Sequence, residues 1–140
     1  MVEEKFVKSK LVVSGKRKSA IAKAVVTDGK GKITVNGKDY KNFNNFDRLK
    51  IEEPIRIGLN ILGGFNFDVA IKVRGGGEKG QIDAIRVALS RAIVGFTKSE
   101  EVEKAFLSYD RNMLVADVRR KEACKPGDSK ARAKRQTSYR

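Results

Sequence analysis

The alternation of apolar and polar residues predicts strands in the first half of the chain. It is clearest in FNFDVAIKVR, at 65–74, where one face consists of Phe65, Phe67, Val69, Ile71 and Val73. Because successive side chains of a strand point to opposite faces, this segment is predicted to be a strand with one buried side. Weaker alternation predicts strands at 6–14, 20–27 and 32–36, and the turn sequences TDGKG (27–31) and NG (36–37) favour antiparallel hairpins.

Apolar residues at helical spacing predict three helices. The first covers 51–62, with Glu52 and Glu53 before Pro54 in its first turn and Gly63–Gly64 as its stop; its apolar positions are Ile51, Ile55, Leu59 and Leu62. The second packs on the apolar face of the sheet through a single stripe of Ile82, Ile85, Leu89, Ile93 and Phe96. The third begins at about Ser99, where SEEVE places carboxylates at the positive end of the helix dipole.

Periodicity ends beyond Val118. The remaining sequence has Pro126–Gly127 as a breaker and almost no apolar residue larger than alanine, so it does not bury enough surface to hold a shape alone. We therefore expect an α+β globular RNA-binding body at 1–116 and an extended basic tail at 117–140. A chain of 140 residues is about one domain long.

The charge of the chain indicates what kind of partner the protein binds. The net charge is +14, and the commonest polyanion available to a small protein of this kind is nucleic acid. The chain has no histidine and one cysteine, Cys124, so neither an intrachain disulfide nor a zinc site nor a cysteine–histidine pair is expected. The absence of a long apolar run predicts no membrane contact and a cytoplasmic location.

Basic residues cluster at a predicted turn and around a glycine-rich segment. The turn Gly15-Lys16-Arg17-Lys18-Ser19 is interpreted as a phosphate contact, against the alternative of a merely solvated turn. Arg74, Lys79, Arg86 and Arg91 lie around the glycines. The alternative to a phosphate contact is that some of them cover apolar surface with the aliphatic part of their side chains.

The segment GGGEKG has the spacing of a dinucleotide-binding fingerprint, because Gly75, Gly77 and Gly80 follow a strand and precede a helix. The context argues against a cofactor, since the second helix is followed by the acidic segment TKSEEVEKAF and not by a hydrophobic strand. We therefore expect no cofactor and no metal, and a loop that a nucleic-acid phosphate could approach closely.

No catalytic arrangement is evident in the sequence. The paired carboxylates Glu52–Glu53 and Glu100–Glu101 point about 100° apart on a helix, so neither pair converges on one substrate. We expect a protein that is not an enzyme.

The ending KARAKRQTSYR is compatible with a nonspecific arm, a localisation signal or a defined RNA contact. Its residue types favour the last of these, because arginine forks onto phosphates, Tyr139 offers an aromatic plane, and Gln136 and Ser138 can hydrogen-bond base or sugar edges. Ordering the segment costs about 1–2 kcal/mol of backbone entropy per residue, so it needs a partner that surrounds it with phosphate.

Four separated blocks resemble one known family. They are GKRKSAIAKAVVTDGKGKITVNGK (15–38), GGGEKGQIDAIRVALSRAI (75–93), LVADVRRKEACKPG (114–127) and KARAKRQTSYR (130–140). In this order they resemble the universal ninth protein of the small ribosomal subunit, in its archaeal or eukaryotic-like form. The segment around Cys124 and Asp128 departs from that family's mostly basic pattern.

The resemblance implies a mixed four-stranded sheet with helices packed on one face and a left-handed β-α-β crossover, like the second domain of the fifth small-subunit protein. It implies partners as well: ribosomal RNA of the subunit head, neighbouring head proteins, and the anticodon stem-loop of the peptidyl-site tRNA. The expected ribosomal RNA contacts are Lys16, Arg17, Lys18, Arg74, Lys79, Arg119, Arg120, Lys130, Arg132, Lys134 and Arg135. The expected tRNA contacts are Ser138, Tyr139 and Arg140. The alternative function is a free nonspecific RNA-binding protein or RNA chaperone.

Overall fold

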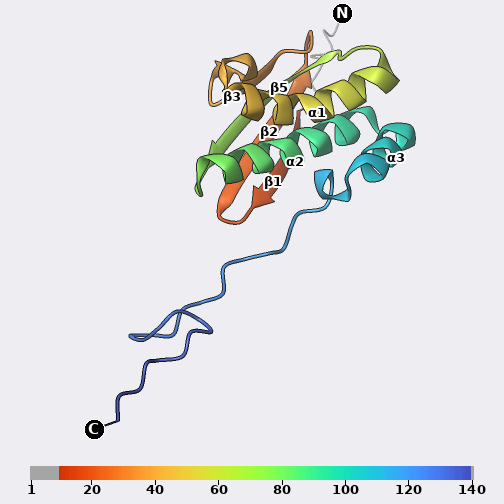
Figure 1. Cartoon of the computed structure of the whole chain (residues 1–140). Helices are drawn as coiled ribbons and strands as arrows, with labels where there is room; N and C mark the ends of the chain where they lie inside the picture. The colour runs from red at the N-terminus through yellow and green to blue at the C-terminus, as the bar shows by residue number, and fades with distance from the viewer. Residues whose placement is uncertain (1–9, 140) are drawn as a thin grey trace, which may run out of the picture.

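Within the described residues, five strands form one mixed sheet in the order β1-β2-β5-β3-β4; β1, β2, β3 and β5 are labelled in Figure 1. The computed structural model describes residues 10–139. The strands are β1 (Leu11–Arg17), β2 (Ala20–Asp28), β3 (Ile33–Val35), β4 (Lys38–Asp39) and β5 (Phe67–Arg74). Strand β2 pairs antiparallel with β1 and β5, whereas β3 runs parallel to β5. The connection from β3 to β5 is therefore of the β-α-β kind, and the predicted α+β class is confirmed.

The predicted four-stranded sheet was wrong by one strand. After the turn at Asn36–Gly37, both with positive φ, the chain returns along β3 and forms the two-residue strand β4. Two residues are too few to show alternation in the sequence. The predicted strand at 6–14 lies partly outside the described residues, and the structure extends β1 to Arg17 because all seven of its residues pair with β2.

The predicted register of β5 is confirmed. Phe67, Val69, Ile71 and Val73 are buried, and the alternate residues face the other side of the sheet. Phe65 lies before the strand and is partly buried, with its ring centroid 5.0 Å from that of Phe67.

Three α-helices follow the predicted order. They are α1 (Asn45–Leu62), α2 (Glu78–Thr97) and α3 (Glu100–Tyr109), with 3₁₀ turns η1 (Tyr40–Asn42) and η2 (Arg111–Met113). The α2 stripe is confirmed, since its four aliphatic members are buried and Phe96 packs against the core from its rim. Ser99 is the N-cap of α3, and three glutamates occupy its first turn as predicted, although the Ser99 side chain forms no capping hydrogen bond.

Helix α1 begins six residues before the predicted start at Ile51. Pro54 therefore lies inside the helix and not in its first turn. The Pro54 ring is buried. Because proline has no backbone N–H, the helix lacks one hydrogen bond there, while Ile51 and Ile55 anchor the helix in the core. The predicted stop is confirmed, because Gly63 adopts φ 71° and its N–H bonds the Leu59 carbonyl.

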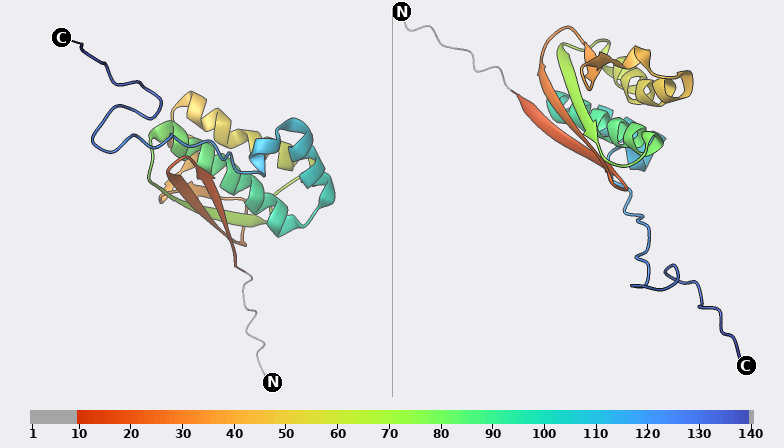
Figure 2. Two further views of the ribbon diagram at one scale, coloured as in Figure 1. Left: turned by 90° about the horizontal axis from the view of Figure 1, so that it is seen from below. Right: turned by 90° about the vertical axis from the view of Figure 1, so that its left-hand side faces the viewer.

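In the part of the chain that the structure describes, all helices lie on one face of the sheet, and the other face has no helix over it (Figure 2). Helices α1 and α2 contact each other, α2 contacts β1, β2 and β5, and α3 packs against α1 and α2. After Met113 the described chain forms no helix or strand, and it runs away from the sheet and helices (Figure 1). Among the described residues, no helix is both long and apolar enough to cross a membrane.

Candidate nucleic-acid interface

The β1–β2 hairpin ends in a two-residue turn, Lys18–Ser19, that projects two exposed polar side chains. Arg17 and Ala20 are the last paired residues of the ladder, and Lys18 takes a positive φ of 52° to close the turn. The sheet therefore fixes the position of this turn at its edge. The predicted basic turn is shorter in the structure, because Gly15, Lys16 and Arg17 belong to β1.

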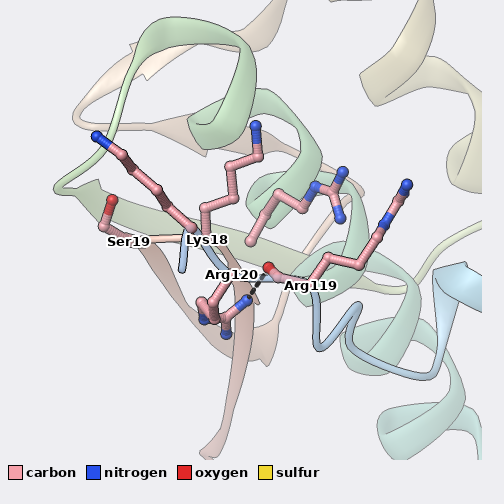
Figure 3. A pocket seen from close by; sticks show the side chains of 6 residues that line it. Lys18, Ser19, Arg119 and Arg120 are labelled. Carbon is pink, nitrogen blue, oxygen red and sulfur yellow. Dashed lines mark hydrogen bonds between the residues drawn. The ribbon is translucent and has the colours of Figure 1, made fainter. Parts of the chain in front are cut away.

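A hollow of about 800 Å³ lies where this turn meets the segment after η2 (Figure 3). Its lining contains five cations and no acid, and the residues are Arg17, Lys18, Ser19, Arg119, Arg120 and Lys121. Residues about 100 positions apart in the sequence thus form one cationic surface. Such a surface suits a polyanion, because phosphates gain charge-assisted hydrogen bonds from arginine and lysine.

Arg17 differs from its neighbours in the hollow because it is held by the protein itself. Its guanidinium forms an ion pair with Asp117, and its Nε lies 3.8 Å from an oxygen of Asp83 on α2. The Arg17 side chain is only 20% exposed. This arginine therefore joins β1, α2 and the beginning of the C-terminal segment. Its main role is to hold the walls of the hollow together.

Asp117 is the carboxylate around which the hollow is organised. Arg119 donates from its side chain, with 2.8 Å between Nη2 and Oδ2, and from its backbone N–H, with 2.9 Å to Oδ1. These two hydrogen bonds from Arg119, and to a smaller extent one from Arg17, hold the pKa of Asp117 well below its ordinary value. The same pair raises the pKa of Arg119. Arg120 and Lys121 have no ion pair within residues 10–139.

The glycine-rich loop lies beside the same hairpin turn. A second hollow of about 490 Å³ is lined by Arg17–Ser19 from the turn and by Gly76–Gly80 from the loop. A Cβ at Gly75 would lie 2.7 Å from the Ser19 carbonyl oxygen, and one at Gly76 would lie 2.9 Å from the Ala20 nitrogen. Both residues also have positive φ. Close packing against the hairpin thus accounts for these glycines without a nucleotide.

Lys79 and Arg74, both predicted contacts near the glycines, have different surroundings. The Lys79 ammonium lies 2.7 Å from the buried carboxylate of Asp47 on α1, and this hydrogen bond raises the pKa of Lys79. Arg74 is exposed at the end of β5 and lines a hollow on the open face of the sheet, not the hairpin hollow. The structure therefore does not bring Arg74 together with Lys18, Arg119 and Arg120.

Arg86 and Arg91 are half-buried and are held by partners within the fold. Arg86 pairs with Glu53 at 2.6 Å and with Asp110 at 2.9 Å. Arg91 donates to the carbonyl oxygens of Leu114 and Ser14, both at 2.8 Å, and so fastens the chain after η2 to β1. Neither arginine is available as a free surface cation.

The predicted contacts of the chain end lie away from the body. Arg132 pairs with Glu122 at 2.9 Å and Arg135 approaches Asp128 at 4.0 Å, so the segment loops back on itself around Pro126–Gly127. Lys130, Lys134, Ser138 and Tyr139 are exposed, and Arg140 lies outside the described residues.

Sequence reasoning missed Lys121 and the organising role of Asp117. Lys121 could have been found from its place in the run Arg119-Arg120-Lys121. The link from Asp117 to β1 had no local signal, because Arg17 is a hundred residues away.

A small α+β body with a cation-lined hollow and a strongly basic chain end is typical of RNA-binding proteins. A family model described as Ribosomal protein S9/S16 matches residues 15–140. The chain belongs to this ribosomal protein family.

Archaeal relatives named "Small ribosomal subunit protein uS9" match almost the whole chain. The protein of Thermoplasma volcanium is 47% identical over 131 residues, which cover 93% of this chain and 98% of the relative. That of Methanococcus vannielii is 46% identical over 129 residues, covering 90% and 95%. That of Thermoplasma acidophilum is 45% identical over 131 residues, covering 93% and 100%. The predicted archaeal-like form of the family, and the prediction of a ribosomal protein that is not an enzyme, are confirmed.

Proposed function

We propose that the protein is a structural constituent of the small ribosomal subunit that binds ribosomal RNA in the subunit head and extends its C-terminal tail to the anticodon stem-loop of the peptidyl-site tRNA. The observation that carries the RNA-binding part is the hollow formed by the hairpin turn and by Arg119–Lys121. Five cations converge there from two distant segments, and the names of the archaeal relatives supply the ribosomal setting.

The division into a body at 1–116 and a tail at 117–140 is part of this proposal. Arg91 ties Leu114 to β1, and Arg17 ties Asp117 to the same strand, so the last contacts with the body are made near this boundary. The tail at 117–140 carries nine Lys or Arg residues against three acids. An exposed basic segment of this kind gains a fixed path when RNA surrounds it.

The individual contacts follow from exposure. Lys18, Arg119 and Arg120 line the hollow toward RNA, while Lys130, Arg132, Lys134 and Arg135 anchor the tail. Ser138, Tyr139 and Arg140 then reach the tRNA. The left-handed sense of the β3-α1-β5 connection and its likeness to the second domain of the fifth small-subunit protein also belong to the proposal.

The test uses small subunits that carry this chain with or without Ser138–Arg140. Removing these residues should leave the sedimentation of the subunits unchanged and weaken retention of peptidyl-site tRNA about tenfold, the effect of losing one charge-assisted hydrogen bond. Lys38→Gln is the matched control, because it removes one positive charge from the far edge of the sheet. Unchanged tRNA retention would contradict the role of the tail. Recovery of the full chain in the free fraction would contradict the ribosomal role and favour an RNA chaperone.

A further inference from the structure

The sheet face without helices carries four exposed cations that the hairpin hollow largely leaves unused. They are Lys16 on β1, Lys23 on β2, and Lys72 and Arg74 on β5. Strand register places them in two neighbouring cross-strand rows. One row runs from Lys16 through Ile21 to Arg74, and the other from Ser14 through Lys23 to Lys72.

Lys23 and Lys72 are directly opposite each other in the β2–β5 ladder. Like charges at such a position destabilise a sheet. None of the four cations has an ion pair within the described part of the chain. On the three described strands that carry these cations, the one carboxylate facing this side is Asp68, which instead accepts the backbone N–H groups of Lys32 at 2.8 Å and of Lys30 at 2.9 Å. The arrangement therefore weakens the isolated sheet and leaves its open face positive.

The shape of this face suits the sugar-phosphate backbone of a nucleic acid more than a base. A hollow of about 580 Å³ lies over β1, β2 and β5, and its apolar lining includes Val12, Ile21 and Ala70. Val12 is 63% exposed and Ile21 is 39% exposed. Among residues 10–139, no aromatic side chain lines the hollow, so this part of the chain offers no plane on which a base could stack. Small side chains and long cationic ones together can receive sugar and phosphate.

We propose that the open face of the sheet is a second RNA surface, on which Lys16, Lys23, Lys72 and Arg74 bind the sugar-phosphate backbone without reading its sequence. This inference rests on the proposed function and adds a surface to it, on the side of the sheet opposite α1 and α2. The positive charge of this face is complementary to the phosphates of RNA. A protein partner is less favoured, because protein interfaces are usually anchored by buried aromatic residues, and the described lining of this hollow has none.

The first experiment measures how salt weakens binding of the full chain to complete small-subunit ribosomal RNA. Each phosphate that a cation neutralises contributes about 0.9 to the steepness of log K against log salt. The variant Lys23→Gln/Lys72→Gln should therefore lower the slope by roughly 2. The variant Lys38→Gln/Lys41→Gln removes the same charge from exposed positions on β4 and η1 and is expected to change the slope much less.

A third variant, Lys18→Gln/Arg120→Gln, separates this inference from the proposed function. If it lowers the slope while the open-face variant behaves like the control, the hairpin hollow binds RNA and the open-face proposal is wrong. If it has no effect while the open-face variant does, the hollow fails and the open face stands. Equal behaviour of all three variants contradicts both.

Stability gives an independent readout. Relief of the Lys23–Lys72 repulsion should raise the melting temperature of the open-face variant by roughly 1–4 °C. A lower melting temperature would mean that these lysines serve the fold, and it would overturn the proposal.

The second experiment locates the partner in assembled subunits. An iron chelate is tethered at Ala70→Cys, an exposed position on the same face of β5 two residues from Lys72, in a Cys124→Ser background that removes the chain's one native cysteine. Hydroxyl radicals should cleave ribosomal RNA near this site. Cleavage of a neighbouring protein chain, with the RNA intact, would show a protein partner and overturn the proposal.

Discussion

Gly15 is a packing residue, although it begins the sequence that was interpreted as a basic turn. A Cβ at this position would lie 2.3 Å from the Ala84 carbonyl oxygen and 2.5 Å from the Ala88 nitrogen, both in the backbone of α2. Gly15→Ala should therefore lower the free energy of unfolding by about 1–3 kcal/mol, measured by urea denaturation. Gly64→Ala is the control, because its Cβ would meet open space. A fully stable Gly15→Ala protein would contradict the close β1–α2 contact.

Asp117 should give the protein an acid-sensitive contact. Because hydrogen bonds from Arg119 and Arg17 lower its pKa in the folded state, its contribution to stability is present above the ordinary aspartate pKa of about 3.9 and is lost as pH falls below that value. We expect Asp117→Asn to lower the melting temperature at pH 6, with the difference from the native protein shrinking between about pH 4 and pH 2.

Asp28→Asn is the matched control for this measurement, since Asp28 is exposed and accepts no side-chain hydrogen bond within residues 10–139. A constant difference between the native protein and Asp117→Asn at every pH would contradict the assigned role.

The sequence predicted which basic residues are exposed better than it predicted which of them form ion pairs. Lys18 and Arg120 are exposed as expected, but Arg17 is held by Asp117 and Asp83, and Lys79 by Asp47. These pairs join residues 32 to 100 positions apart. No local pattern reports such contacts, because they form only after the sheet and helices have packed.

At the scale of elements, Arg86 connects three helices. It lies on α2 and reaches Glu53 on α1 and Asp110 at the end of α3. Burial alone would raise the pKa of Asp110, but the Asn112 N–H and Arg86 outweigh it and lower that pKa. Arg86→Ala should reduce the free energy of unfolding by about 2 kcal/mol, because it leaves two half-buried carboxylates without their cation.

The control for Arg86 is Arg56→Ala. Arg56 pairs with Glu52 on the surface of α1 and is 68% exposed, so its removal should change stability by less than about 0.5 kcal/mol. Equal effects of the two substitutions in chemical denaturation would contradict the connecting role of Arg86.

Elements with long periodic patterns were predicted well, whereas the two-residue strand β4 and the start of α1 were not. The five alternating residues of 65–73 and the stripe of α2 each bury one face against a common core, so their patterns had one physical cause. β4 contains two residues, and α1 continues through Pro54 because the core contacts of Ile51 and Ile55 hold both sides of the interruption. Tertiary packing thus overrode the local signal at these two places.

At the scale of the whole molecule, the body and the basic chain end have separate physical origins. The core consists of apolar residues between Ala20 and Met113, and it includes none from beyond Met113. The chain end carries dense charge and few apolar residues, and this composition predicts it as a part separate from the body. Composition was not enough to show that Arg119–Lys121 returns to the hairpin turn, since that meeting depends on Asp117 and Arg91 holding the start of the segment.

Truncation after Val118 tests this separation. The shortened chain keeps the Arg17–Asp117 pair and the whole core, so its melting temperature should stay within a few degrees of that of the full chain. It lacks nine Lys or Arg residues. At about 0.9 per phosphate contact, the salt slope of ribosomal RNA binding should fall by at most roughly 8, and affinity should fall most strongly at low salt.

A full-length variant with Lys130, Arg132, Lys134 and Arg135 changed to glutamine should give an intermediate slope, because it keeps Arg119–Lys121 at the hollow. Calorimetry and filter binding on the three proteins measure both properties. A truncated chain that melts far below the full chain would show that the tail supports the fold. A truncated chain with an unchanged slope would show that the body alone makes the phosphate contacts, which would leave the basic ending without the RNA role assigned to it.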